Sequence, residues 1–130
     1  MSLRNTRVSL ERALSGSADL SVARSTLQLG RFIKLRLLGS DDGDMTPEVW
    51  AYIGPRAHYL LIPMTYCSCH DFIIRSVAKG ASDYCKHLVG LELARRGGKI
   101  SEIELSPDEM LVVVREILKY RFSQTLRRKL

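Results

Sequence analysis

Three cysteines and one histidine constrain the fold of this chain more than any other feature of its sequence. Cys67 and Cys69 form a Cys-x-Cys pair, and after fifteen intervening residues Cys85 and His87 form a Cys-x-His pair. Structural Zn²⁺ is held by four nitrogen or sulfur ligands in a tetrahedron, and three cysteines with one histidine are a standard set. The pattern therefore predicts one bound zinc ion. The fold must bring these four residues together to bind it.

The spacing within each pair suits one shared ion. Residues i and i+2 of an extended chain point the same way, so Cys67 and Cys69 can face one metal. Cys85 and His87 can converge on it if Cys85 lies just before a helix and His87 in its first turn. The amides of that helix start would then stabilise the Cys85 thiolate. Four protein ligands close the coordination sphere, which favours a structural site over a catalytic one.

Other interpretations of the cysteines explain less of the pattern. An odd number of cysteines without an export signal argues against a disulfide framework. A redox Cys-x-Cys pair accounts for neither Cys85 nor His87, and a metal-free group of buried cysteines does not require the histidine. His70 directly follows Cys69, which makes coordination by both awkward, so we expect it at the surface or behind the ligands. His58 lies away from the cysteines and is predicted to be an ordinary strand histidine.

Length and composition bound the architecture. A chain of 130 residues with 45% hydrophobic and 26% charged residues is typical of one globular domain, here residues 1–130. No apolar run approaches the roughly 20 residues that span a bilayer. The N-terminal stretch has no unbroken apolar core, so no secretory signal is visible. These features predict an intracellular protein.

Periodicity predicts the secondary structure. Helical patterns occupy residues 4–14 and 19–30. Residues 31–38 alternate between apolar and polar, which predicts a strand with one solvent-exposed face that carries Lys34 and Arg36. Residues 48–53 and 57–62 are predicted strands of a hairpin, because Gly54 and Pro55 mark a tight connection. A helix is expected over 86–96, before the Gly97-Gly98 stop. The last helix, 106–126, starts with an Ser106 N-cap, a proline and a glutamate three residues after the cap.

The predicted fold class is therefore α+β. A small antiparallel sheet of about three strands leads into the metal-binding pairs, with helices at both ends of the chain. The C-terminal helix carries more apolar residues than one buried stripe requires, which marks Leu118 and Phe122 as candidate partner-binding residues. A plain core helix is the alternative.

The run YCSCHDF…YCKHLVGLELA resembles the SWIM-type zinc finger, whose pattern is Cys-x-Cys, a variable spacer and Cys-x-His at the start of a helix. The resemblance covers residues 48–97 and implies a β-hairpin that leads into the first pair. His70 departs from the small residue or proline often found there. The resemblance implies that Cys67, Cys69, Cys85 and His87 are zinc ligands, that Phe72 is the aromatic packing residue, and that Leu88 and Leu91 belong to the helix after the ligands.

Size and layout are similar to those of the small free-standing SWIM subunits of Shu-type complexes. Those subunits pair with RecA-family recombinase paralogues and promote homologous recombination. The resemblance thus implies a non-enzymatic adaptor that binds a RecA-family paralogue ATPase, the pair acting on recombinase filaments and single-stranded DNA. It also implies a cytoplasmic, nucleoid-associated protein in an archaeal version, which we favour, and a nuclear one in a eukaryotic version.

A zinc finger that binds DNA or RNA directly is the alternative function. The net charge is +6, and the tail from Ile117 has five bases and no acid, which suits a polyanion partner. Solvated charge on a frayed tail is the simpler interpretation of that tail. An enzyme is not expected, because no phosphate-cradling glycine-rich loop is visible. Candidate phosphate contacts are Arg75, Lys79, Lys86, Arg95 and Arg96, with Lys99 and Arg127 to Lys129 in addition, and candidate stacking surfaces are Tyr66, Phe72 and Tyr84.

Overall fold

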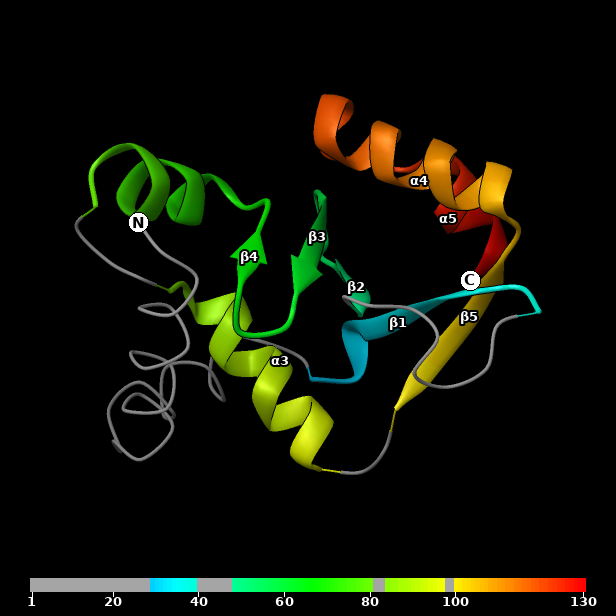
Figure 1. The fold of residues 1–130 in the computed structure, drawn as a ribbon, viewed down its shortest axis with the longest axis horizontal. Coiled ribbons are helices and arrows are strands. Elements are labelled where there is room, and N and C mark those ends of the chain that lie inside the picture. Colours follow the sequence, from blue (N-terminus) through cyan, green and yellow to red (C-terminus); the bar gives the residue numbers. More distant parts are fainter. Residues whose placement is uncertain (1–28, 40–47, 81–83, 98–99) are drawn as a thin grey trace.

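The computed structural model describes residues 29–39, 48–80, 84–97 and 100–130 (Figure 1). The helical patterns at 4–14 and 19–28 lie outside these residues. The strands are β1 (Phe32–Leu37), β2 (Val49–Ile53), β3 (His58–Ile62), β4 (Tyr66–Cys67) and β5 (Ser101–Leu105). The helical segments are a 3₁₀ turn η1 (Leu29–Arg31), a π-helical segment η2 (Phe72–Ala78), α3 (Lys86–Arg96), α4 (Pro107–Tyr120) and α5 (Gln124–Lys129). Among the described helices, none is long and apolar enough to cross a bilayer.

The protein is α+β, as predicted, but its sheet is larger than the sequence suggested. Five strands lie in the order β4-β3-β2-β1-β5. The three predicted strands are the central antiparallel ones, and the predicted hairpin is β2 and β3. The expectation of about three antiparallel strands was wrong, because β4 adds one edge and β5 pairs in parallel with β1 at the other. Parallel neighbours need a long connection, and here α3 carries the chain across the sheet toward β5 (Figure 1).

Helices cover both faces of this sheet, which gives the protein two hydrophobic layers. Figure 1 shows α3 on one side and α4 with α5 on the other. Side chains alternate along each strand, so neighbouring residues supply opposite layers. The first layer contains Phe32, Trp50, Tyr52, Leu61, Phe72, Leu88, Val89, Leu91 and the three cysteines. The second contains Leu35, Ala51, Leu60, Leu105, Met110, Val113, Ile117 and Leu126.

The start of α4 is the capping box that the sequence predicts. The Glu109 backbone N–H donates to Ser106 Oγ over 3.2 Å, and the Ser106 N–H donates to Glu109 Oε1 over 2.9 Å. The predicted single helix 106–126 is divided, however. Arg121 adopts the left-handed conformation, with φ 61°, and ends α4, after which Ser123 caps α5. The turn allows Leu126 to be fully buried in the second layer, which a straight helix along α4 would not.

His58 attaches this turn to the sheet. The ring is buried and stacks on Phe122 with centroids 4.3 Å apart. Its Nδ1 accepts a hydrogen bond from the Ser123 N–H over 3.1 Å, and its backbone N–H donates to the Arg121 carbonyl over 2.9 Å. Burial, and then the Arg127 charge, lower the pKa of His58 below its ordinary value of 6.5. The sequence predicted an ordinary strand histidine, whereas its neutral form holds the α4–α5 turn in place.

The buried, neutral His58 predicts a pH dependence of stability. Because its pKa is lower when folded, the unfolded chain takes up the proton first, and the free energy of unfolding falls as pH falls through about 6.5. Between pH 7.5 and 6 we expect a loss of up to about 0.8 kcal/mol in zinc-saturated protein, the limit for a histidine that stays neutral when folded. Urea unfolding at the two pH values would measure it. His58→Asn keeps an acceptor near the position of Nδ1 but does not titrate, so the pH-dependent loss that His58 causes should be absent from this variant. An equal loss of stability in both proteins would contradict the conclusion that the buried His58 is neutral.

Candidate metal centre

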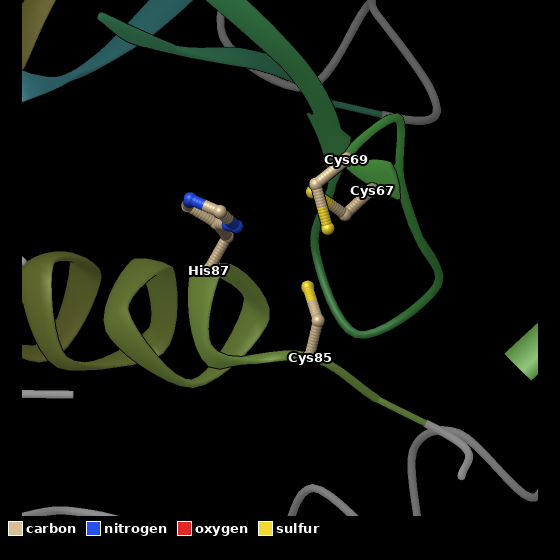
Figure 2. Close-up of side chains that lie close together, drawn as sticks. All are labelled: Cys67, Cys69, Cys85 and His87. Carbon is tan, nitrogen blue, oxygen red and sulfur yellow. The ribbon is translucent and has the colours of Figure 1, made fainter. Parts of the chain in front are cut away.

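The four predicted ligands meet between the β4 edge of the sheet and the start of α3. Cys67 ends β4, Cys69 follows two residues later, Cys85 is the N-cap of α3 and His87 lies in its first turn. One ligand atom from each residue lies within 4.8 Å of all the others, and all four residues are buried. Figure 2 shows the Cys67 and Cys69 side chains on one side and those of Cys85 and His87, from α3, facing them. The sequence prediction that these residues converge is confirmed.

Backbone pairing sets the geometry of the first pair. Leu61 lies opposite Cys67 in the β3–β4 ladder. Ser68 extends this pairing, since its N–H donates to the Leu60 carbonyl over 2.9 Å and its Oγ accepts from the Leu60 N–H over 2.8 Å. The chain therefore stays paired with β3 through Ser68 and bends at Cys69 into the following helical segment, with the two sulfurs on the same side of the site (Figure 2). The sequence analysis did not assign Ser68 this positioning role.

The helix start sets the geometry of the second pair. Cys85 has extended dihedrals, φ −125° and ψ 171°, and its carbonyl accepts the Leu88 and Val89 amides. The imidazole of His87 packs against Tyr52 and Tyr59, with ring centroids 5.2 and 4.7 Å away. Sequence reasoning also missed these two tyrosines. Strand alternation offered a signal, because Tyr59 is two residues before Leu61 and so shares the face that carries Cys67.

Protons are unevenly distributed over the three thiols. Burial raises the pKa of Cys67 far above its ordinary value and that of Cys85 to about 12. Hydrogen bonds from those two thiols, with a smaller contribution from the Phe72 backbone N–H at 3.3 Å, lower the pKa of Cys69. The Leu88 amide at the helix start favours the Cys85 thiolate, as expected, but burial outweighs it and leaves the pKa raised. Negative charge in the thiol cluster is therefore favoured on Cys69.

The residues fit a bound metal ion. The Nδ1 atom of His87 is buried and has no hydrogen-bond partner among the described residues, a costly state for a polar atom unless something else binds it. Three sulfurs and one imidazole nitrogen form a soft donor set suited to Zn²⁺ and related ions. A metal in this position would use the orphaned nitrogen and neutralise the sulfur anions. The structure thus shows a cluster that can hold a metal, without showing which metal it is.

The other predicted site residues are distributed over the surface around the centre. His70 is exposed, in accordance with its predicted surface position. Lys79 and Lys86 are exposed at the end of η2 and the start of α3, and Arg75 pairs with Asp71 over 3.3 Å. Phe72 is fully buried against Tyr66, which agrees with its packing role and excludes it as a stacking surface for bases.

Two further predicted phosphate contacts, Arg95 and Arg96, belong to an ion-pair network, and Lys99 lies outside the described residues. Arg95 bonds Glu92 and also pairs with Glu48 over 3.1 Å, while Arg96 lies 3.9 Å from Glu92. Lys34 pairs with the other oxygen of Glu48 over 3.3 Å. Glu92 is buried, so these cations compensate its carboxylate and fasten the end of α3 to the sheet. Much of their charge is already satisfied within the protein.

Substitutions should distinguish His70, which we do not expect to bind the metal, from the four ligands. Cys85→Ser removes a sulfur from a closed site, so we expect the zinc affinity to fall by at least about 100-fold and the chain to be partly unfolded. His70→Ala should keep one zinc per chain and the wild-type circular dichroism spectrum. Metal analysis after dialysis, with far-ultraviolet spectra, would check both. A natively folded, cooperatively melting Cys85→Ser protein, or zinc loss in His70→Ala, would contradict the ligand assignment.

The thiol protons predict proton release on metal binding. Cys67 and Cys85 are protonated near pH 7 and must lose their protons to bind. We therefore expect at least about two protons to be released per zinc at pH 7, and an affinity that falls as pH falls. Calorimetric titration in buffers of different ionisation enthalpy would count them. Release of fewer than two protons would contradict the raised pKa of Cys67 and Cys85.

Comparison with known proteins identifies no relative of this chain. No protein-family model, no curated protein and no solved structure matches the chain. The metal centre therefore rests on its own residues and geometry.

Proposed function

We propose that this chain is a zinc-stabilised, non-enzymatic adaptor of the SWIM type that pairs with a RecA-family paralogue ATPase in homologous recombination. One observation carries the proposal. A buried Cys₃His cluster joins a hairpin to the first turn of a helix, in the order Cys-x-Cys then Cys-x-His. That arrangement is the one implied by the resemblance of residues 48–97 to a SWIM finger.

The properties of the cluster favour zinc in a structural role. All four ligands are buried, and the donors are sulfur and imidazole nitrogen only. Four such ligands complete a tetrahedral shell and leave no open position for a substrate or an activated water. The centre connects β4, η2 and α3, which otherwise contact one another little. Zinc would therefore contribute to folding, while any nucleotide chemistry would belong to the partner.

The exposed flank of α4 supports an adaptor role. Leu111 and Leu118 are 58% and 53% exposed and lie two turns apart on one side of the helix. The opposite side faces α5, because Glu109 pairs with Lys129 and Glu116 accepts the Ser123 hydroxyl. Each leucine follows one of these glutamates by two residues, about 200° around the helix. This flank, Leu111 with Leu118, is an apolar ridge that no part of the described structure covers, of the kind that protein partners use.

The structure refines the predicted partner-binding pair. Leu118 is on the ridge, but Phe122 is half-buried and stacks on His58. A charged residue at Phe122 would disturb the α4–α5 turn as well as any partner. Leu111 is the better companion to Leu118 in a test of docking.

Docking should fail without loss of the metal when the ridge is charged. The tagged chain would be recovered from its native cells after nuclease treatment and its partners identified by mass spectrometry. We expect a RecA-family ATPase with the wild type and with Leu130→Glu, an exposed apolar control on the far end of α5. The Leu111→Glu/Leu118→Glu variant should lose it and retain one zinc per chain. Recovery of nucleic acid and its usual binders alone would contradict the adaptor proposal.

That contrary outcome would favour the second candidate, a finger that binds DNA or RNA directly. The observation behind it is that Lys79 and Lys86 are exposed on the two segments that flank the metal centre. Strong weakening of binding between 50 and 200 mM salt would be its signature.

A further inference from the structure

A group of cations and aromatic rings gathers where α4 turns into α5, on the side of the sheet away from the metal centre. We call this group the α4–α5 corner. It adjoins the second hydrophobic layer, which contains Ile117 of α4 and Leu126 of α5, whereas the cysteines belong to the first. Its members are Lys119, Tyr120, Arg121, Phe122, Arg127 and Arg128.

The aromatic rings of the corner already lie beside cations. Tyr120 is 66% exposed, the highest value among the exposed large hydrophobic side chains of the described residues, and the Lys119 ammonium lies 5.3 Å from its ring centroid. Phe122 stacks on His58, and the Arg127 guanidinium lies 5.8 Å from its centroid. An exposed tyrosine among cations combines a stacking surface with charges that suit phosphates.

The acidic residues of α4 leave this charge largely uncompensated. Glu109 pairs with Lys129, which is outside the corner. Glu116 faces α5, where its carboxylate accepts hydrogen bonds from the Ser123 hydroxyl and the Thr125 N–H and interacts with the Arg128 charge. Among the described residues, no ion pair satisfies Lys119, Arg121 or Arg127. Four cations therefore stand against one carboxylate.

The corner is held in one shape rather than being a frayed tail. The left-handed Arg121 closes α4, and its carbonyl accepts the His58 N–H. Ser123 caps α5, and Leu126 is fully buried beneath it. A preorganised surface binds a ligand without first losing conformational entropy. Arg127 and Arg128 are exposed at the end of α5, as the solvated-charge interpretation of the tail expects, but the tail is helical rather than frayed.

We propose that the α4–α5 corner binds single-stranded nucleic acid, with phosphates contacting Arg121, Arg127 and Arg128 and an unpaired base stacking on Tyr120. Stacking needs an accessible base face, which single strands offer and duplexes conceal. The phosphates alone would be matched by any polyanion, so the exposed tyrosine is what selects nucleic acid over an acidic peptide. The proposal depends neither on the adaptor function nor on the finger.

Binding would be measured with zinc-loaded full-length chain and fluorescein-labelled oligonucleotides of fifteen deoxythymidines or fifteen uridines, by anisotropy at 50 to 200 mM salt. We expect binding that weakens with salt, and a loss of about 5- to 100-fold in affinity for Tyr120→Ala. Tyr120→Phe keeps the ring and should bind within about twofold of the wild type. Arg121→Gln/Arg127→Gln should weaken binding and lower the slope of log affinity against log salt by up to about 1.4.

Matched variants locate the site. Lys79→Gln/Lys86→Gln, on the metal side, should bind like the wild type, and so should Leu111→Glu/Leu118→Glu after allowance for its added charge. Zinc content and thermal melting of Tyr120→Ala and Tyr120→Phe should match those of the wild type. Tighter binding of the deoxythymidine strand would identify DNA as the ligand, tighter binding of the uridine strand would identify RNA, and equal binding would show that the corner accepts either single strand.

Several results would overturn the proposal. These are no binding at 50 mM salt, a well-folded Tyr120→Ala protein that binds within twofold of the wild type, or displacement of the oligonucleotide by polyglutamate at equal charge. Loss of binding only in Lys79→Gln/Lys86→Gln would place the nucleic acid on the finger instead. The ridge variant and the corner variants change different residues. A failure of the nucleic-acid proposal would therefore not affect the partner-docking experiment.

Discussion

The alternation of side chains along β3 is the constraint on which both faces of the protein depend. Tyr59 and Leu61 point to the metal side, where one packs on His87 and the other lies opposite Cys67. His58 and Leu60 point to the other side, where His58 holds the α4–α5 turn. A slip of one residue would exchange these sets. The register of β3 with β2 and β4 therefore positions the candidate metal centre and the basic corner together.

The sequence predicted those features that local residue types decide. Cysteine and histidine spacing identified the four ligands, and Ser106 with Glu109 identified the start of α4. The pairing of β5 with β1 was not predictable in the same way. Residues 101–105 do alternate between polar and apolar, but a short alternating run does not reveal which strand it joins, or in which direction. The left-handed break at Arg121 likewise follows from where Leu126 finds a buried position, which is a tertiary property.

Charge is the property that the sequence alone described least well. A count of arginines marked Arg95 and Arg96 as phosphate contacts, while the fold brings a buried Glu92 beside them. The thiols show the same effect, since the helix start favours an anion at Cys85 but burial there is stronger. The corner is the converse case, because the turn at Arg121 lets α5 fold back and brings Arg127 over the Phe122 ring. Which charges are available depends on partners that tertiary structure supplies.

The two candidate sites differ in how much they depend on a metal. The metal centre lies at β4, a two-residue edge strand whose pairing with β3 is extended by Ser68 alone, and its three thiols include two that burial keeps protonated. Without an ion, few hydrogen bonds hold this edge, and one buried imidazole nitrogen is left without a partner among the described residues. The corner instead rests on α4, which packs across β1, β3 and β5 and begins with a complete capping box. Metal loss should therefore loosen the finger first, while the second hydrophobic layer keeps the corner in place.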